Sequence, residues 1–315
     1  MSELPRDILR RIGNTALLPL RRVVPGNGCR ILLKLESENP TGSMKDRMAL
    51  AMIDAAEADG RLTREASVVE YTGGSTGVSL ALVCAVKGYP LHIVSSDAFA
   101  REKLDQMRIL GARLQIVPSP GGGMTEKLTR DMIEAARIVA LNTGAFWTDQ
   151  MNNRDQLAAY HQLAEEIWNQ TGGEIDGFVQ GVGTAASLRG IGQALRRHKA
   201  RLRIVAVEPS ESPVLSGGPA GAHKIDGIGA GFVVPLWQKD LADQIEPVST
   251  EEAMAMAFRL AQEEGLFAGT STGANVIAAL RLAEQLEPGA TVITLMCDTG
   301  MKYLRTYGAR LPNRT

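Results

Sequence analysis

Asn39-Pro40-Thr41-Gly42-Ser43-Met44-Lys45-Asp46-Arg47 follows a predicted strand over 31–35 and opens a predicted helix over 44–58. The stretch places Lys45 in the first helical turn, where the helix dipole disfavours a cation by a few tenths to about 1 kcal/mol. Burial would lower the pKa of this amine further, and a partly neutral lysine is what imine chemistry and proton abstraction require. For Lys45 alone, the simpler interpretation is an exposed side chain whose charge is offset by Asp46.

The same strand–turn–helix unit recurs along the whole chain. Further strands are predicted over 67–71, 91–94, 114–117, 177–180, 204–207 and 291–296, and further helices over 78–87, 101–110, 154–169, 187–197, 251–264 and 273–285. Strands separated by helices imply parallel sheets with right-handed crossovers, so the predicted fold class is α/β, with a boundary near residue 150. Residues 119–123 are predicted to form a mobile surface loop. Residues 208–238 contain no clear element, which is typical of a functional segment.

The composition narrows the class of protein. The 315 residues carry 34 Lys+Arg and 35 Asp+Glu, a formal net charge of −1, whereas a nucleic-acid binder would be strongly basic. Three widely spaced cysteines favour neither a disulfide framework nor a thiolate metal site, so no metal is expected. No apolar run approaches the roughly 20 residues that span a bilayer, and no secretory signal is present. We therefore expect a soluble, cytoplasmic protein with no nucleic-acid or membrane partner.

The turn Gly181-Val182-Gly183-Thr184-Ala185-Ala186-Ser187 lies between a predicted strand and a predicted helix. It can direct several backbone N–H groups and two hydroxyls at an anion, and the helix dipole adds to the attraction. It also matches the dinucleotide pattern G-x-G-x-x-A, and Glu208 ends the next strand, near the place of a ribose-binding acid. A plain tight turn, an anion site and an NAD-dependent dehydrogenase that uses this turn all remain open at this point.

A second turn, Gly73-Gly74-Ser75-Thr76-Gly77, matches G-x-S-x-G in the strand–turn–helix context of a nucleophile elbow. A serine hydrolase with Ser75 as nucleophile would need a later acid and then a histidine. The last histidine, His223, comes long before the end of the αβ pattern, which is an awkward place for such a base. The alternative is a second anion cradle at a helix N-terminus, suited to a carboxylate, and we prefer it.

Two later segments offer hydroxyl and carboxylate groups. Gly269-Thr270-Ser271-Thr272-Gly273 opens a predicted helix, and Asp298 follows the last predicted strand. Helix capping is the simplest role for both when each is considered alone. The four histidines have no metal-ligand spacing.

Two anion cradles, one poised lysine and a hydroxyl loop together suit a phosphate-bearing aldehyde cofactor that holds an amino acid. The chain resembles the fold-type II pyridoxal-phosphate enzymes, and within them the cysteine synthase (O-acetylserine sulfhydrylase) and cystathionine β-synthase group. Six motifs in the family's order, spread over nearly the whole chain, carry the resemblance. They are Ile12-Gly13-Asn14-Thr15-Ala16-Leu17, the Lys45 stretch, Trp147-Thr148-Asp149-Gln150-Met151-Asn152-Asn153, the turn at Gly181, Glu-Pro-Ser-Glu-Ser-Pro-Val-Leu-Ser-Gly-Gly over 208–218, and His-Lys-Ile-Asp-Gly-Ile-Gly-Ala-Gly-Phe over 223–232.

The resemblance implies two three-layer αβα domains with mostly parallel sheets, as in the tryptophan synthase β-like fold. Residues 1–40 and 151–315 would form the large domain that holds the cofactor phosphate, and 41–150 the small mobile domain that binds substrate. It also implies a homodimer with the active site between the two domains. Some relatives bind the C-terminal tail of serine acetyltransferase, which is therefore a candidate partner.

The resemblance also assigns roles to residues of this chain. Lys45 would form the imine with pyridoxal 5′-phosphate and later move the Cα proton. The other cofactor contacts would come from Ser75, Gly183, Thr184, Ala185, Ala186, Ser187 and Ser271, with Ser271 facing the pyridine nitrogen. The substrate contacts would come from Thr72, Gly73, Thr76, Gln150 and Gly227. A neutral hydroxyl at the ring nitrogen makes a moderate electron sink, which favours β-elimination to an aminoacrylate.

The implied activity is β-replacement on an activated L-serine, with O-acetylserine as the expected donor and sulfide as the nucleophile that gives L-cysteine. Related chemistry that yields cystathionine, β-cyanoalanine or 2,3-diaminopropionate, a donor such as O-phosphoserine, or simple elimination also fits the same pattern. A non-catalytic member of the family that serves as a binding subunit is a further alternative.

Several departures from the family pattern bear on the substrate rather than on the cofactor. Ser75 stands where asparagine is usual, within Thr-Gly-Gly-Ser-Thr-Gly in place of Thr-Ser-Gly-Asn-Thr-Gly. Met301-Lys302 replaces the commoner Glu-Arg. Ala185-Ala186 replaces glycines, and we expect this turn to present its backbone donors only if φ stays negative.

Overall fold

The computed structural model describes residues 7–119 and 125–311, and its strands form two sheets. The six-stranded sheet contains, in spatial order, β1 (Leu17–Pro19), β2 (Arg30–Lys34), β10 (Thr291–Leu295), β7 (Gly177–Gly181), β8 (Arg203–Pro209) and β9 (Gln244–Val248). The four-stranded sheet contains β5 (Arg113–Val117), β4 (Leu91–Ser96), β3 (Val68–Tyr71) and β6 (Phe146–Trp147). Paired strands run parallel in both sheets, and only β1 and β2 are antiparallel within the described residues. The predicted α/β class with mostly parallel sheets is confirmed.

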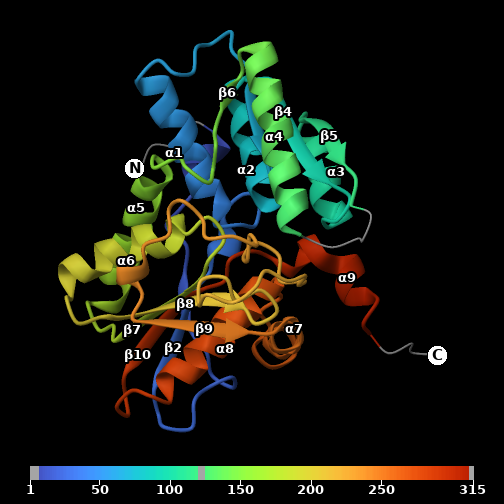
Figure 1. Cartoon of the computed structure of the whole chain (residues 1–315). Coiled ribbons are helices and arrows are strands. Elements are labelled where there is room, and N and C mark those ends of the chain that lie inside the picture. The colour runs from blue at the N-terminus through green and yellow to red at the C-terminus, as the bar shows by residue number, and fades with distance from the viewer. Residues whose placement is uncertain (1–6, 120–124, 312–315) are drawn as a thin grey trace.

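Helices cover both sheets (Figure 1). The α-helices are α1 (Lys45–Ala58), α2 (Ser75–Lys87), α3 (Arg101–Ile109), α4 (Glu126–Thr143), α5 (Gln156–Thr171), α6 (Ala186–His198), α7 (Thr250–Arg259), α8 (Thr270–Ala283) and α9 (Leu304–Gly308). Shorter turns are η1 (Ile8–Arg11), η2 (Glu36–Glu38), η3 (Lys239–Leu241), η4 (Leu260–Glu264) and η5 (Gly300–Tyr303). In Figure 1 the four-stranded sheet with α2, α3 and α4 forms the upper part, and the six-stranded sheet with α6, α7 and α8 forms the lower part.

The strands that lead into the site are buried on both faces. Every residue of β3, β7 and β10 is buried, as expected for parallel strands covered by helices on both sides. The polar side chains in these strands, such as Glu70, Gln180 and Thr294, are buried as well and form hydrogen bonds inside the protein. The turns after these three strands lie at the same junction between the two parts, which places the candidate site there.

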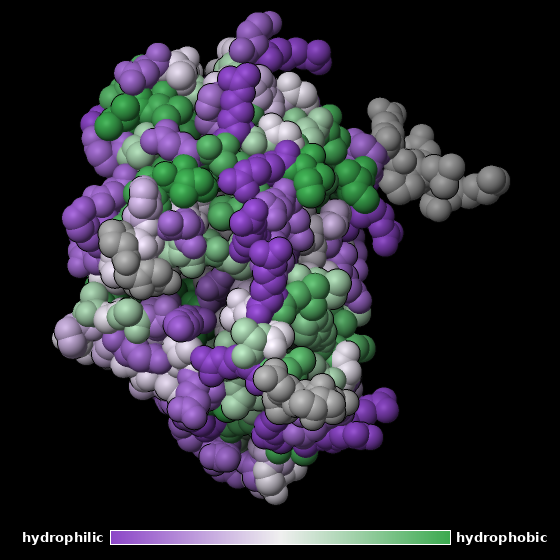
Figure 2. Space-filling model, turned by 90° about the vertical axis from the view of Figure 1, so that its right-hand side faces the viewer, coloured by the Kyte–Doolittle hydropathy of each residue, from purple (hydrophilic) through white to green (hydrophobic). Residues whose placement is uncertain are grey.

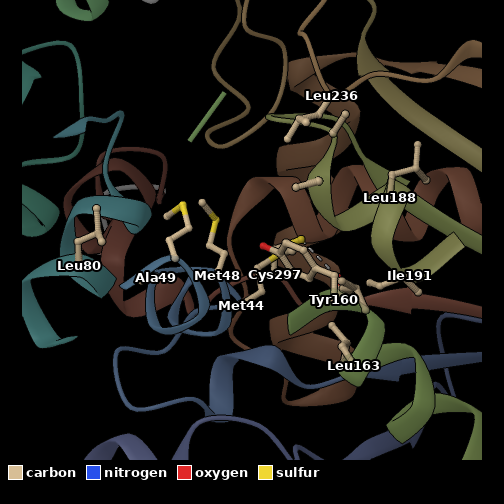
Figure 3. Close-up of a cluster of buried hydrophobic side chains, with 14 of the residues drawn as sticks. Met44, Met48, Ala49, Leu80, Tyr160, Leu163, Leu188, Ile191, Leu236 and Cys297 are labelled. Carbon is tan, nitrogen blue, oxygen red and sulfur yellow. Dashed lines mark hydrogen bonds between the residues drawn. The ribbon is translucent and has the colours of Figure 1, made fainter. Parts of the chain in front are cut away.

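One apolar cluster runs through both parts of the molecule. It contains residues of β3 and β4 as well as residues of β8 and β10. Figure 3 shows Met44, the N-cap of α1, and Met48 of α1 between Leu80 of α2 and Tyr160 of α5, with Cys297 beside Tyr160. The residue after Met44 is Lys45, so this packed cluster fixes the start of α1 beneath the candidate site.

The structure also contains elements that the sequence patterns did not predict. These are β1, β6, β9, α4, α9 and the short turns. The predicted helix over 251–264 is divided into α7 and a π-helical turn, η4. Residues 210–238 contain no regular element, as predicted. The predicted surface loop falls mostly on residues 120–124, which lie outside the described residues.

In the view of Figure 2, green (hydrophobic) and purple (hydrophilic) side chains are interspersed over the face that is shown. Within the described ranges, no helix combines the length and the apolar character that crossing a bilayer requires.

Candidate active site

A cavity of about 1130 Å³, part of which is open to solvent, lies where segments from both sheets meet. Its wall includes the turns that follow β3, β7 and β10, together with the first residues of α1 and α8. Helices α2, α6 and α8 all begin at this cavity, and none of the three has a side-chain cap or an acidic residue in its first turn. Three positive helix ends therefore face one space, which favours a ligand with more than one anionic group.

The cavity brings together most of the residues that the sequence analysis assigned to the site. Its wall contains Lys45, Thr72, Gly73, Ser75, Thr76, Gln150, Gly183, Thr184, Ser187, Gly227 and Ser271. Ala185 and Ala186 lie in the same turn as Gly183 but are buried behind the wall. The role of each of these residues stays a prediction, and their convergence is the observation on which it rests.

Lys45 is the first residue of α1, and its side chain forms part of the cavity wall. The pKa of its ammonium group is lowered, chiefly because the walls remove water from it, although Cys297 and Asp298 partly oppose the shift. The positive end of α1 acts in the same direction as the desolvation. A lysine with a lowered pKa has a larger neutral fraction near pH 7, so it is a better base and nucleophile.

Asp46 does not offset the charge of Lys45 at an exposed site, so the simpler interpretation of this pair is wrong. The Asp46 carboxylate is buried and accepts hydrogen bonds from the main-chain N–H of Thr41 (2.8 Å), the Thr41 hydroxyl and the Ser79 hydroxyl (2.6 Å). Neighbouring residues on one helix point in different directions, and here packing directs the acid into the protein and the amine into the cavity.

The turn from β7 to α6 lets main-chain atoms approach a ligand closely. A Cβ atom at Gly183 would lie 2.2 Å from the carbonyl oxygen of Gly227, so only glycine fits there. Ala185 has a φ of +68°, so the negative φ that we set as a condition for donation by this turn is not observed at this residue. The chain must reverse sharply between Gly183 and the start of α6, and a left-handed residue provides that reversal at a cost of about 1–2 kcal/mol for an L-residue.

Side chains around this turn are held by a second layer of hydrogen bonds. The hydroxyl of Ser187 accepts from the side-chain amide of Gln180 (3.2 Å), and the hydroxyl of Thr184 accepts from the main-chain N–H of Ala186 (3.3 Å). The main-chain N–H of Gly181 donates to Asn275 (2.8 Å). The turn is therefore pre-formed, which reduces the ordering that a bound anion would otherwise require.

The predicted hydroxyl caps of α8 are not present. Gly269 occupies the N-cap position and no side chain caps the helix. Thr270 accepts a hydrogen bond from the main-chain N–H of Asp226 (3.3 Å), and Thr272 accepts one from the main-chain N–H of Cys297 (3.1 Å). Both threonines thus tie α8 to neighbouring loops, while Ser271 lines the cavity.

The loop after β3 is ordered by its own hydrogen bonds. The Thr72 hydroxyl accepts from the main-chain N–H of Gly74 (3.0 Å), and the Thr76 hydroxyl donates to the Gln150 side-chain oxygen (2.8 Å). The Gln150 amide donates in turn to the carbonyl oxygen of Tyr71 (2.7 Å). Thr76 and Gln150 are thus joined to each other at the N-terminus of α2, while Thr72 orders the turn that precedes the helix.

A group of charged and hydroxyl side chains that was not predicted lies on another part of the wall. Lys103, Asp226, Asp298 and Tyr303 all line the cavity, and none was assigned to it. Asp298 was predicted to cap a helix, and this prediction is wrong. Its carboxylate accepts hydrogen bonds from the hydroxyls of Ser75 (3.1 Å) and Tyr303 (2.7 Å). The only available signal was the position of Asp226 next to Gly227, because Lys103 and Tyr303 lie in segments without a motif.

Two alternatives from the sequence analysis are wrong. The Ser75 hydroxyl donates to Asp298 and, among the described residues, has no histidine partner, while His223 is engaged with the carbonyl oxygen of Gly229 (2.9 Å). This geometry provides no base for a serine hydrolase. Glu208 is buried outside the cavity wall and accepts hydrogen bonds from residues 215 and 216, so it does not serve as a ribose ligand.

The residues present fit pyridoxal phosphate. The turn at Gly183 offers N–H donors without a side chain in the way, as a phosphate requires. Lys45 offers an amine with a lowered pKa, as an aldehyde requires. Among residues 7–119 and 125–311, no cluster of three or more His, Cys, Asp or Glu side chains is arranged to hold a metal ion, and all three cysteines are free.

Comparisons with known proteins agree with this geometry. Residues 8–298 match the family described as "Pyridoxal-phosphate dependent enzyme". The chain is 38% identical to a cysteine synthase of Staphylococcus aureus (strain Mu50 / ATCC 700699) over 312 residues, covering 97% of this chain and 98% of that protein.

Two solved structures extend the similarity to the fold. The structure of a cysteine synthase (OASS) from Entamoeba histolytica is 35% identical, with a TM-score of 0.91 and coverage of 100% of this chain and 93% of that chain. The structure of an O-acetylserine dependent cystathionine β-synthase from Helicobacter pylori is 32% identical, with a TM-score of 0.89 and coverage of 96% and 98%. The chain therefore belongs to the pyridoxal-phosphate dependent enzyme family, with the fold of the cysteine synthase and cystathionine β-synthase group and pyridoxal phosphate as its cofactor.

Proposed function

We propose that this enzyme catalyses β-replacement on an activated L-serine, with O-acetylserine as the donor and sulfide as the nucleophile, to give L-cysteine and acetate. The relatives named above support this choice of reaction. The supporting observation in the structure is the convergence of Lys45 with the positive ends of α2, α6 and α8 on one cavity. A cofactor phosphate and a substrate carboxylate each need one such helix end.

The cofactor would be held mainly by main-chain donors. Its phosphate would lie at the start of α6 against Gly183, Thr184, Ala185, Ala186 and Ser187, its pyridine nitrogen at Ser271 and its ring hydroxyl at Ser75. When bound, pyridoxal phosphate supplies an aldehyde that condenses with amines and a ring that withdraws electrons from an amino-acid Cα. The Ser271 hydroxyl carries no charge, so it orients the ring without fixing a proton on it.

Lys45 is the residue that moves the proton. Its Nζ, which has a larger neutral fraction because its pKa is lowered by desolvation, accepts the proton from the substrate Cα. Asp298 and Cys297 favour the charged form that results. Loss of acetate from Cβ and addition of sulfide at the same carbon complete the exchange, and Lys45 returns the proton to Cα.

The loop over 72–76 would bind the substrate carboxylate. The N-terminus of α2 attracts a negative group, and Thr72, Gly73, Thr76 and Gln150 surround it. Gly73 packs against the ring of Phe99, where an added Cβ would lie 2.7 Å from the nearest ring atom. Gly227 would contact the substrate from the opposite side, where the loop over 223–232 faces the cavity.

A spectral screen of the purified holoenzyme tests this proposal. The protein should be yellow, and borohydride should fix the cofactor onto Lys45, as peptide mapping would show. O-acetylserine, O-phosphoserine, serine and cysteine are then added in turn, followed by sulfide. We expect O-acetylserine to change the visible spectrum and sulfide to restore it with release of cysteine. A colourless protein that does not bind pyridoxal phosphate, or a response to another donor alone, would contradict the proposal.

The control for this screen is a pair of lysine variants. Lys45→Ala should lower the turnover rate by at least about 10²-fold, because both the imine and the base are lost. Lys127→Ala removes an exposed lysine on α4 that pairs only with Asp131 at the surface, so it should leave turnover unchanged. A similar loss in both variants would indicate a general effect on folding.

The architecture supports three further parts of the proposal. We propose that residues 1–40 and 151–315 form the large domain and 41–150 the small domain that closes on substrate, because the two sheets draw their strands from these ranges. We also propose that the enzyme is a cytoplasmic homodimer and that serine acetyltransferase is a candidate partner. Light scattering of the protein alone and with serine acetyltransferase tests the last two points.

A further inference from the structure

A row of hydrogen bonds along the cavity wall includes Lys103, Asp226 and Tyr303, which have no role in the steps described above. The Asp226 carboxylate contacts Nζ of Lys103 (2.9 Å), and the same Nζ contacts the Tyr303 hydroxyl (2.8 Å). That hydroxyl donates to Oδ2 of Asp298 (2.7 Å), which also accepts from Ser75 (3.1 Å). All five residues line the cavity.

The row joins the two parts of the molecule at two points. Ser75 and Lys103 belong to α2 and α3, which pack on the four-stranded sheet. Asp226 lies in the loop after β8, and Asp298 and Tyr303 follow β10, so these three belong to the six-stranded part. The contacts from Lys103 and from Ser75 therefore both cross the junction that surrounds the cavity.

Lys103 is the central member of the row. Its side chain is only 2% exposed, and its aliphatic stem packs on the substrate loop, because a Cβ at Gly74 would lie 2.3 Å from Cδ of Lys103. Its ammonium group also lies 4.2 Å from the centre of the Tyr303 ring. The stem thus presses on the loop over 72–76, while the charged end is held by the opposite part of the molecule. A desolvated, charge-assisted contact of this kind is stronger than a surface ion pair.

We propose that Lys103 is a positioning residue that holds the loop over 72–76 at a set distance from the cofactor cradle and thereby determines the affinity for substrate. The inference deepens the proposed function and rests on it, because it requires this loop to bind the substrate carboxylate. Lys103 acts through Gly74 and through the contacts with Asp226 and Tyr303. It touches neither reacting atom.

The proposal separates substrate binding from cofactor binding. Within the described residues, Lys103 forms no direct hydrogen bond or ion pair with Gly183, Ser271 or Lys45. Loss of the ammonium group would free the loop relative to the cradle while Tyr303 still donates to Asp298. The substrate, which must touch both sides, would then bind more weakly, whereas cofactor affinity would not change.

The test uses Lys103→Met in the holoenzyme, because methionine keeps an aliphatic stem against Gly74 and removes the charge. We expect the concentration of O-acetylserine that half-saturates the spectral change to rise by about tenfold or more, the loss typical of a charge-assisted hydrogen bond. The dissociation constant of pyridoxal phosphate should stay the same. Amide hydrogen exchange over 72–78, measured without substrate, should become faster.

Three further variants test whether the effect on substrate affinity comes from the charge of Lys103 and its contact with Asp226. Arg101→Met removes a cation from the same helix whose partner, Asp105, lies on that helix, so it should change neither substrate affinity nor exchange. Lys103→Arg keeps the charge and should restore part of the substrate affinity. Lys103→Met combined with Asp226→Asn should weaken substrate binding no more than Lys103→Met alone, because both changes break one contact.

Unchanged substrate affinity and unchanged exchange in Lys103→Met would overturn the proposal, as would an equal loss of cofactor affinity. If Lys103→Met does not fold, Asp226→Asn takes its place and should shift both readouts in the same direction. If the wild-type holoenzyme does not respond to O-acetylserine, the proposed function fails. Faster exchange over 72–78 in Lys103→Met would still support the positional role in that case.

Discussion

A half-buried glutamate, Glu166, and a fully buried one, Glu70, lie in different parts of the molecule and have opposite pKa shifts. Burial would raise the pKa of Glu166 on α5, but the hydrogen bonds and charge of Arg47, together with Lys34, lower it to about 2. The distances are 2.7 Å to Arg47 and 2.8 Å to Lys34. The Arg47 guanidinium also contacts Glu36 (2.6 Å), whose side chain is fully buried.

Glu70 on β3 has hydrogen-bond donors but, among the residues that the structure describes, no cationic partner. Its carboxylate accepts hydrogen bonds from the Thr148 hydroxyl (2.7 Å) and from the main-chain N–H groups of Gln150 and Tyr71 (both 2.8 Å). Burial raises its pKa to about 8, because these neutral donors only partly replace water. Two carboxylates that are both well hydrogen-bonded therefore differ because only one has positive partners.

The comparison extends to the two sides of the cavity. The paired charges of Arg47 join α1 to Glu36 and to Glu166 on α5, and the six-stranded part presents mainly main-chain atoms at the Gly183 turn. The four-stranded part presents the side chains of Thr72, Thr76 and Gln150. The hydrogen bonds that lead from Thr76 through Gln150 to Glu70 have only uncharged donors. We infer that the substrate side depends on the protonation of Glu70.

The largest change in the free energy of unfolding is expected from removing the ion pairs of Arg47 with Glu36 and Glu166. Arg47→Met leaves Glu36 buried without a cation, so the free energy of unfolding should fall by about 3–5 kcal/mol. Glu166 would also lose its main positive partner, so the stability that it contributes above its usual pKa should decrease. Urea unfolding measures both effects. Lys127→Met, which breaks an exposed pair, should cost less than about 1 kcal/mol, and a similar cost in the two variants would contradict the interpretation.

The raised pKa of Glu70 predicts how the free energy of unfolding depends on pH. The folded-state pKa of Glu70 is about 8 against a usual value of 4.5, so folding takes up a proton between these values and the stability falls as pH rises through that window. This contribution amounts to a few kcal/mol. Glu70→Gln cannot ionise, so the stability difference between wild type and variant should shrink or change sign from pH 5 to pH 8.5. A difference that does not depend on pH would show that Glu70 is ionised throughout.

Glu166 gives the opposite dependence and serves as the internal comparison. Its pKa is lowered to about 2, so the stability that it contributes is present above pH 4.5 and is lost as pH falls through that pKa. Urea unfolding of the wild type and Glu70→Gln below pH 4.5 should therefore give parallel curves.

The close approach at the cradle can be tested at Gly183. Gly183→Ala places a Cβ within 2.2 Å of the Gly227 carbonyl oxygen, so the turn must shift at a cost of about 1–3 kcal/mol. We expect a weaker dissociation constant for pyridoxal phosphate, measured by spectral titration. Gly26→Ala is the matched control, since an added Cβ there meets no atom within 4 Å. Equal cofactor affinity in Gly183→Ala and the wild type would argue against a phosphate at this turn.

The smallest effect is expected at Ala185, which has a φ of +68°. Ala185→Gly removes the left-handed strain of about 1–2 kcal/mol but adds chain entropy to the unfolded state, so the net gain should be up to about 1 kcal/mol. Ala186→Gly, one residue later at the start of α6, should instead destabilise by about 0.5–1 kcal/mol. Urea unfolding of the two variants compares them directly, and destabilisation by both would mean that Ala185 is not strained.

Much of the fold could be predicted because it depends on local patterns. The strands at 31–35, 177–180 and 291–296 are apolar runs between turn residues, and the structure places β2, β7 and β10 within one residue of these bounds. The short strands β1, β6 and β9 were missed, because runs of two to five residues at the edges of the sheets have little local signal. α4 was missed although Leu128, Met132 and Ala136 have the spacing of a buried helix face.

Some residues of the candidate site could also be predicted from local motifs, and others could not. Lys45, the glycine turns and Ser271 stand in motifs, so their chemistry could be inferred residue by residue. The left-handed Ala185 could not, because backbone conformation at a non-glycine residue depends on the reversal that the surrounding turn imposes. Asp298 was assigned to a cap because a single carboxylate beside a helix start has no local feature that shows which distant groups it meets.

The sequence by itself determined the alternation of strands and helices, the amine at Lys45 and the glycine turns, because each depends on neighbours within a few positions. Tertiary structure alone decided that Lys103 meets Asp226 and Tyr303, and that Glu70 and Glu166 shift in opposite directions. The reason is physical: ion pairing and desolvation depend on which groups packing brings together, and these groups lie far apart along the chain.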